Sequence, residues 1–182
     1  RQQGATYCVT VPLADALPQE KSRQLQTERH EWLSRYPGEL TAQRQQELND
    51  FLWQWQENEL DQGLGSCALA SPEVSDLVER ALRHFDGERY VLGGFVVMPN
   101  HVHAILQPIQ EHQLSEVLHS WKSFTANAVN KALNRSGQFW QEESFDRIVR
   151  DAAELEKFAS YIEQNPTKAK LAAGKFRLGS GV

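Results

Sequence analysis

At residues 98–106 the chain reads Met98-Pro99-Asn100-His101-Val102-His103-Ala104-Ile105-Leu106. The apolar residues after the proline are typical of a buried strand, and residues 89–98 are expected to form another strand just before it. The short Pro-Asn link between the two predicts a β-hairpin. Residues two apart on a strand point to the same face, so His101 and His103 should project side by side. Two imidazoles on one face form half of a metal site, unless they are ordinary polar residues of a sheet surface.

A second informative segment lies near the C-terminus, where residues 151–166 are expected to form an amphipathic helix. Asp151 fits an N-cap, and Pro166 is expected to end the helix. Tyr161 and Asn165 are four residues apart, which stacks them on one flank of the apolar stripe. The spacing therefore places a hydroxyl and an amide on the same side of the helix, at the border of the core. The alternative is a boundary tyrosine with a solvated hydroxyl, followed by an asparagine C-cap.

The rest of the chain supplies the other elements of an α+β fold. Further strands are expected at residues 5–11 and 147–150, and helices at 17–36, 41–59, 71–86 and 114–133. Without the first two helices the order is β-α-β-β-α-β followed by the tyrosine helix, which is the ferredoxin-like split arrangement with an antiparallel sheet. Residues 1–182 are predicted to form one domain, with a helical hairpin inserted at 17–60 and a loose glycine-rich tail from residue 174.

Together these segments resemble the single-tyrosine HUH transposases, and in particular the branch called REP-associated tyrosine transposases. The resemblance rests on Phe95-Val-Val-Met-Pro-Asn-His-Val-His103, on Phe139-Trp-Gln141 and on Tyr161-Ile-Glu-Gln-Asn-Pro166, which occur in the family's order. It spans about residues 66–171 and the N-terminal strand. It implies an HUH endonuclease core, in which the last helix crosses the open face of the sheet and brings the tyrosine to the histidines.

The resemblance also implies a role for each site residue. His101 and His103 would be metal ligands, Asn165 would take the position of the third protein ligand, and Tyr161 would be the nucleophile. Some relatives have glutamine at the position of Asn165. The implied cofactor is a divalent ion, Mg²⁺ or Mn²⁺, and the implied partners are single-stranded DNA hairpins of the REP type. The protein would act as a monomer or a homodimer.

The implied reaction suits these residue types. A tyrosine that attacks a phosphodiester forms a covalent phosphotyrosine, which conserves the bond for rejoining the strand. A phenol has an ordinary pKa of about 10, so it needs activation at neutral pH. A divalent ion held by two imidazoles and an amide keeps open positions for phosphate oxygens. Two alternatives stay open: a catalytically silent hairpin-binding regulator, and a metal-dependent phosphodiester hydrolase that forms no covalent intermediate.

The net charge of −5 argues against a protein that binds nucleic acid over its whole surface. The charge is unevenly distributed, however, because residues 1–113 carry −7 and residues 114–182 carry +2. The basic half contains the tyrosine helix, which predicts a local, salt-sensitive DNA surface. The predicted phosphate contacts are Lys122, Arg147, Arg150, Lys157 and Lys168.

Several classes of protein are not expected from this sequence. It has no apolar run long enough to cross a membrane and no signal-peptide pattern. It also lacks both glycine-rich phosphate-binding motifs, so no nucleotide cofactor is expected. Cys8 and Cys67 are isolated and are interpreted as reduced packing residues. These features predict a cytoplasmic, nucleoid-associated protein without a membrane partner.

Overall fold

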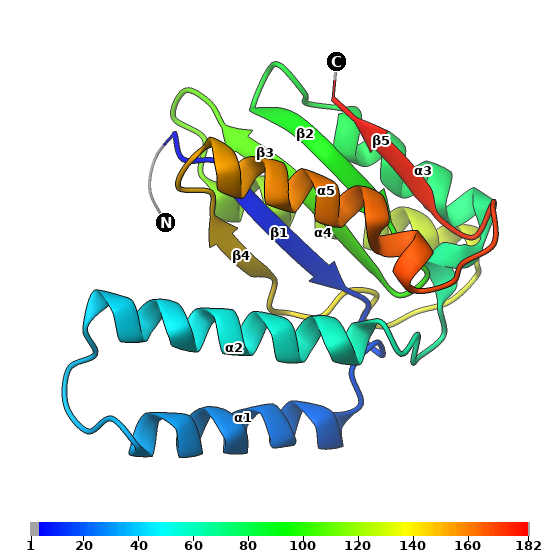
Figure 1. Ribbon diagram of the computed structural model, residues 1–182. Helices are drawn as coiled ribbons and strands as arrows, with labels where there is room; N and C mark the ends of the chain where they lie inside the picture. The colour runs from blue at the N-terminus through cyan, green and yellow to red at the C-terminus, as the bar shows by residue number, and fades with distance from the viewer. Residues whose placement is uncertain (1–3, 182) are drawn as a thin grey trace.

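A five-stranded antiparallel sheet forms the centre of the computed structural model, which describes residues 4–181 (Figure 1). The strands, in the spatial order β4-β1-β3-β2-β5, are β1 (Tyr7–Pro12), β2 (Tyr90–Val97), β3 (His101–Pro108), β4 (Phe145–Ile148) and β5 (Arg177–Ser180). The helices are α1 (Gln19–Ser34), α2 (Ala42–Leu60), α3 (Pro72–Arg83), α4 (Leu114–Ala132) and α5 (Ala152–Lys168), with a short 3-10 helix, η1 (Ala68–Ala70).

The expected ferredoxin-like α+β architecture is confirmed. Helices α3 and α4 cover one face of the sheet, and α5 crosses the other face (Figure 1). Strands β2 and β3 form the expected hairpin, with the backbone N–H of Met98 donating to the carbonyl of His101. The register of this hairpin shifts between Leu92 and Phe95. Gly93 lies at this shift, and a Cβ added to it would come within 3.1 Å of the Ile105 side chain. Such a close approach is typical of a glycine inside a strand.

Side chains of the central strands alternate between the two faces. Along β1, Tyr7 and Val9 join the large apolar cluster beneath α3 and α4. Cys8 packs on the other face with Phe158 of α5, and it is a free thiol, as expected. Thr10 lies opposite His103 in the antiparallel register of β1 and β3, so both side chains point to the α5 face. The alternation therefore separates an apolar face from a face that carries polar groups.

Two expectations about the C-terminal part are wrong. Pro166 does not end its helix, because α5 continues to Lys168. Proline has a helical φ, and the next turn is held by bonds from the N–H of Ala169 to the carbonyl of Asn165 and from the N–H of Leu171 to the carbonyl of Pro166. Asn165 is therefore an interior helix residue and does not form a C-cap.

The glycine-rich tail is also more ordered than expected. It forms the edge strand β5, which pairs with β2. Gly179 lies against the ring of Phe95, where an added Cβ would come within 2.6 Å of a ring carbon. A glycine at this position lets β5 approach β2 closely, so this residue helps the tail to pair as a strand. Strand β4 likewise begins and ends two residues earlier than expected.

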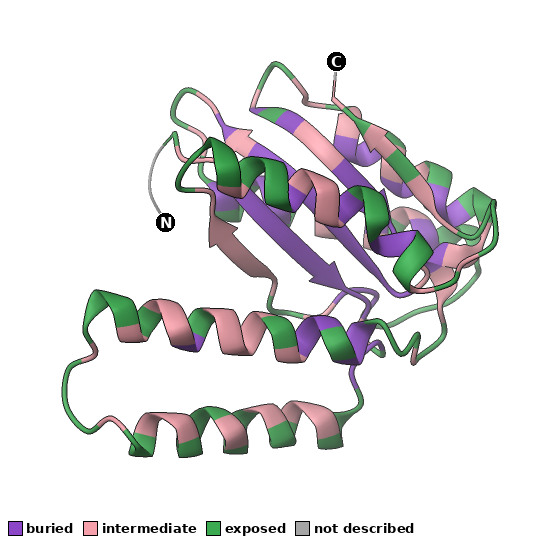
Figure 2. Ribbon diagram, viewed as in Figure 1, coloured by how far each residue is buried: buried purple, intermediate pink, exposed green. Residues whose placement is uncertain are grey.

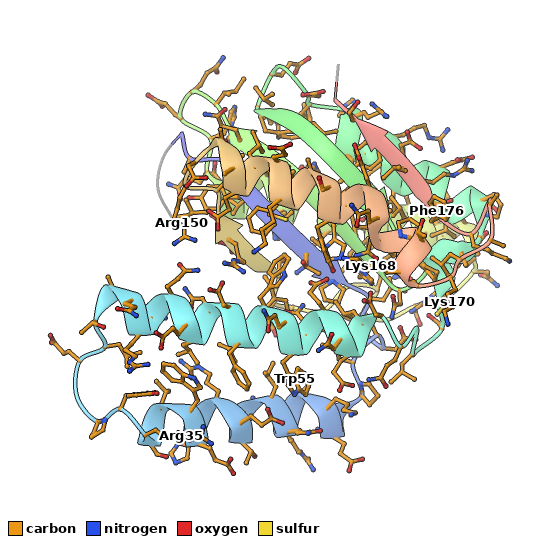
Figure 3. All side chains as sticks on the ribbon, in the orientation of Figure 1. Arg35, Trp55, Arg150, Lys168, Lys170 and Phe176 are labelled. Atoms are coloured by element: carbon orange, nitrogen blue, oxygen red, sulfur yellow. The ribbon has the colours of Figure 1, made fainter. Side chains whose placement is uncertain are left out.

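The predicted insertion forms a helical hairpin at the side of the sheet (Figure 1). Helix α1 has no buried residue, whereas α2 buries five at positions from Leu48 to Leu60. Four of those five lie in the last turn and a half, where Figure 2 shows the buried part of the helix beside the sheet. Trp55 points toward α1 (Figure 3). The hairpin therefore contacts the core mainly through the C-terminal end of α2.

Candidate active site and metal centre

The two histidines of β3 lie side by side on the α5 face of the sheet. Their ring centroids are 4.5 Å apart, and neither side chain is exposed to solvent. The alternation of β3 produces this pairing, because the intervening Val102 points into the apolar cluster on the opposite face. The juxtaposition expected from the His-x-His spacing is thus present in the structure.

The orientation of His101 is set by its neighbour Asn100. The Asn100 amide nitrogen donates to the carbonyls of Leu60 (3.0 Å) and Leu64 (3.3 Å), which turns its oxygen toward His101. That oxygen lies 2.7 Å from His101 Nδ1, so Nδ1 carries the proton and donates it. Burial, and to a lesser extent the nearby His103, hold the pKa of His101 well below its ordinary value. His101 is therefore a neutral imidazole whose Nε2 carries a free lone pair.

The orientation of His103 is set by Thr10 and a carboxylate. The Thr10 hydroxyl donates to Glu57 Oε1 at 3.2 Å, which uses its single proton. Thr10 Oγ1 also lies 2.9 Å from His103 Nδ1 and must therefore accept a proton from it. His103 Nε2 then faces Glu57 Oε2 at 3.1 Å without forming a hydrogen bond. A lone pair and a carboxylate oxygen repel each other at that distance unless a proton or a cation lies between them.

Glu57 was not among the residues expected at the site. It lies on α2, in the insertion, and its carboxylate reaches across to the histidines. Within residues 4–181, Glu57, His101 and His103 form one cluster whose possible ligand atoms all lie within 4.8 Å of one another. A signal for it did exist in the sequence. Glu57 falls four residues after Trp53 and three before Leu60, so it shares a helix face with two large apolar residues.

Tyr161 reaches this cluster from α5. Its hydroxyl donates a hydrogen bond to Glu57 Oε2, the same oxygen that faces His103. Its ring lies 5.4 Å from the His103 ring, between centroids, and 6.4 Å from the ring of Trp53. Burial raises the pKa of Tyr161 well above its ordinary value, and the nearby charge of Glu57 raises it further. The free phenol is therefore protonated, and its proton points at a carboxylate.

Asn165 lies one helical turn after Tyr161, and it is 1% exposed. Among the described residues, neither its amide nitrogen nor its amide oxygen finds a hydrogen-bond partner. A buried amide without partners is unfavourable in a folded protein and calls for an explanation. The expectation that Asn165 binds an ion from α5 provides one, and it stays a prediction.

These donor groups fit a divalent ion. The fit rests on unpaired atoms: the Nε2 atoms of both histidines and the amide of Asn165 are buried without partners in the described part of the chain. The Nδ1 atoms are held by oxygen acceptors, the usual arrangement behind a metal-bound imidazole. The carboxylate of Glu57 adds a hard oxygen ligand to the two imidazoles and the amide. This ligand set therefore prefers Mn²⁺ and Mg²⁺ more than imidazoles and an amide alone would.

The structure brings three of the five predicted DNA-contacting cations near Tyr161, whereas Arg150 pairs with Glu154 at the start of α5. Lys157, Lys168 and Arg147 line the hollow that contains its side chain, and Lys168 Nζ lies 4.8 Å from the centre of its ring. Arg150 and Lys168 stand at opposite ends of α5 (Figure 3). Lys122 is separated from this group. It lies on α4, and its ammonium group donates to the carbonyl of Glu142 at 2.6 Å.

Comparisons with known proteins agree with the geometry. The family described as "Transposase IS200 like" matches residues 71–165, just over half of the chain. That range contains α3, β2, β3, α4, β4 and most of α5, and with them His101, His103 and Tyr161. No match was found among curated proteins.

One similar solved structure is described as "Structure of the REP associates tyrosine transposase bound to a REP hairpin". The two chains share 15% sequence identity and superpose with a TM-score of 0.55, over 94% of this chain and 72% of the other. At that identity the likeness establishes a shared fold. Separately, none of the described helices is both long and apolar enough to cross a bilayer.

Proposed function

The chain belongs to the IS200-like transposase family, and from that premise we propose that it cleaves and rejoins single-stranded DNA through a covalent bond to Tyr161. Membership agrees with the resemblance carried by the histidine and tyrosine motifs. The proposed substrates are hairpin-forming strands of the REP type, which is the ligand class named for the similar solved structure.

The observation that carries this proposal is the convergence of Tyr161 and the two histidines on the carboxylate of Glu57. Glu57 Oε2 accepts the hydrogen bond of Tyr161 and lies 3.1 Å from His103 Nε2, and the possible ligand atom of His101 belongs to the same cluster. A tyrosine with only a structural role would not need its hydroxyl buried beside two unpaired imidazole nitrogens. A nucleophile that must attack a phosphate beside an ion does need this placement.

In the proposed reaction, Tyr161 Oη attacks the scissile phosphorus in line with the departing deoxyribose oxygen. The phenolic proton passes to Glu57 Oε2, which already accepts its hydrogen bond. A bond from phosphorus to Tyr161 forms as the bond to deoxyribose breaks, and the departing deoxyribose oxygen takes up a proton from solvent water. The reverse attack by a free strand end restores the diester, so the reaction needs no nucleotide cofactor.

We assign the ion ligands to His101 and His103, with Glu57 and Asn165 completing the set from two different helices. Bound there, Mg²⁺ or Mn²⁺ would supply Lewis-acid polarisation of the phosphate. The protein's own contribution is orientation. Asn100 and Thr10 fix the two imidazole tautomers. The ring of Trp53 packs against Phe158 and against Tyr161, at 5.8 and 6.4 Å between centroids.

A covalent-trapping gel tests the proposal. The protein is mixed with labelled hairpin oligonucleotides taken from palindromes that flank its own gene, Mn²⁺ is added, and the mixture is denatured. We expect a DNA–protein band that disappears with Tyr161→Phe and with chelator. Tyr36→Phe is the matched control, because Tyr36 packs on Trp32 in the insertion, outside the site, and should leave the band intact.

Two results would contradict the proposal. Cleaved DNA without an adduct, unaffected by Tyr161→Phe, would indicate a hydrolase that uses an activated water. Hairpin binding with neither cleavage nor adduct would indicate a silent regulator that kept the fold of its family.

A further inference from the structure

A groove runs along α2 toward the tyrosine. It consists of two hollows, one of about 630 Å³ between α2 and β4 and one of about 430 Å³ that contains the side chains of Tyr161 and Glu57. The side chains of Trp53 and Arg147 line both hollows, so the two adjoin at these residues. The groove therefore leads from the edge strand of the sheet to the proposed nucleophile.

One face of α2 lines the first hollow. Gln46, Asn49, Trp53 and Gln56 all border it, and their spacings of three and four residues place them on one side of the helix. The rise of an α-helix is about 1.5 Å per residue, so the three amides are distributed over roughly 15 Å. Within α2, the Gln46 amide nitrogen donates to Asp50 and the Asn49 oxygen accepts from Gln45, both at 3.0 Å. The other end of each amide can still hydrogen-bond to successive groups of an extended ligand.

Gln56 provides the observation that points to a ligand. Its side chain is 1% exposed, it borders the hollow, and within residues 4–181 its amide nitrogen has no hydrogen-bond partner. A buried donor without an acceptor destabilises a folded protein. An acceptor brought by a bound molecule would satisfy it.

We propose that this groove holds the single strand that flanks the scissile phosphate, and that the amides of α2 recognise its bases. This inference rests on the function proposed above. A carboxamide carries both donors and acceptors, and glutamine and asparagine pair with base edges, most favourably with adenine. Unpaired bases expose their Watson–Crick edges as well, which a duplex uses for pairing.

The charges around the groove agree with base recognition more than with general phosphate binding. Arg147 already pairs with Asp50 and lies 3.8 Å from Glu154, so much of its charge is neutralised. Lys157 and Lys168 lie in the hollow nearest Tyr161. Phosphate contacts should therefore concentrate at the cleavage point, and the amide row should supply sequence preference beyond it.

The test uses a hairpin oligonucleotide with a randomised single-stranded tail and the Tyr161→Phe protein, which binds without forming an adduct. Bound tails are recovered and sequenced, and affinities are measured by fluorescence anisotropy. We expect enrichment of particular bases in the tail. Gln56→Leu should weaken binding of the enriched tail roughly ten-fold and leave the tail-less hairpin unaffected. The same variant should raise the melting temperature of the free protein, because it removes the unpaired donor.

Gln43→Leu is the matched control, since Gln43 is on the same helix but hydrogen-bonds to Glu47 away from the groove. Asn49→Ala is the second variant, because Asn49 is exposed and its replacement does not threaten folding. This variant should lose the base preference at tail positions farther from the cleaved phosphate. The groove assignment alone would be overturned if the wild-type protein still forms the adduct but the recovered tails show no base preference. Unchanged affinity for the enriched tail in both groove variants would overturn it in the same way. Absence of both tail selection and adduct would overturn the function as well.

Discussion

On the α3 and α4 side of the sheet, the polar atoms at the centre of the core are paired: the Tyr90 hydroxyl donates to the carbonyl of Leu82 at 2.7 Å and accepts from the Trp121 indole at 2.9 Å. Near the end of α4, the side-chain oxygen of Asn130 is the exception among the described residues. On the α5 and α2 side, buried groups of His101, His103 and Asn165 lack partners among the described residues. The first side is arranged for stability. The second carries an energetic cost that is expected at a site whose ligands arrive from outside.

The largest expected effect comes from removing a large side chain from the apolar side. Trp121 is buried against Tyr90, with ring centroids 5.2 Å apart. Trp121→Ala should lower the free energy of unfolding by about 3–5 kcal/mol, measured by chemical denaturation. Phe124→Ala is the control on the same helix, because Phe124 is 60% exposed and should change stability by less than about 0.5 kcal/mol. Equal losses in both variants would contradict the comparison.

A change at the site should have the opposite sign. In Glu57→Gln, the new amide nitrogen replaces Oε2 and can donate one hydrogen to His103 Nε2 and the other to the Tyr161 oxygen, whose own proton then turns away from residue 57. Without divalent ions, we expect the free energy of unfolding to rise by about 1 kcal/mol. Affinity for Mn²⁺, measured by calorimetry, should fall at least about ten-fold, since a charged ligand is lost.

Glu59→Gln is the matched control for this variant. Glu59 is the other buried glutamate in this turn of α2, but it already accepts from Lys21 at 3.1 Å and from Gln62 at 2.8 Å. Its replacement should lower stability slightly and leave Mn²⁺ affinity unchanged. A loss of stability in Glu57→Gln as large as that in Glu59→Gln would mean that Glu57 is an ordinary paired carboxylate.

A smaller effect should appear with pH. Burial holds the pKa of His101 well below its ordinary value, so the folded protein leaves this group neutral where the unfolded chain protonates it. The unfolded state then binds more protons below about pH 6.5, and stability falls as the pH is lowered through that region. Melting temperatures in chelator should show this decrease, and His101→Gln should flatten it. A profile identical in both proteins would rule His101 out as the cause.

The smallest expected effect is at the start of α5. Hydrogen bonding from Arg150, above all, holds the pKa of Glu154 below its usual range, so this contribution is present near neutral pH and is lost as the carboxyl protonates in acid. Arg150 is largely exposed, and Glu154→Gln should cost no more than about 0.5–1 kcal/mol. High salt should reduce the difference, with the exposed Glu156→Gln as the control.

The sequence predicted those parts of the site that depend on local periodicity. The strand spacing placed His101 and His103 together, and the helical spacing put Tyr161 and Asn165 on one flank of α5. The order of elements was sufficient for the ferredoxin-like core. These features repeat every two or every three to four residues, so a single chain displays them without any knowledge of its long-range contacts.

Glu57 could not be predicted in the same way. Its partners His101 and Tyr161 are 44 and 104 residues away in sequence, and glutamate is seldom buried. The edge strand β5 was missed because glycine is rare in strands, and the close packing of Gly179 on Phe95 depends on tertiary structure. The extension of α5 past Pro166 was missed for a similar reason, since bonds of the following turn offset the missing N–H.

The Asn100 side chain limits how this protein can be simplified. One carboxamide both closes the end of the inserted hairpin, through the carbonyls of Leu60 and Leu64, and orients His101. Excising residues 17–60 would therefore remove the shorter of the two bonds that hold this carboxamide, as well as Glu57, and would leave only the bond of 3.3 Å to the carbonyl of Leu64. The hairpin is not a detachable module, because a shortened chain would need a new acceptor for the Asn100 amide and a new carboxylate on the remaining scaffold.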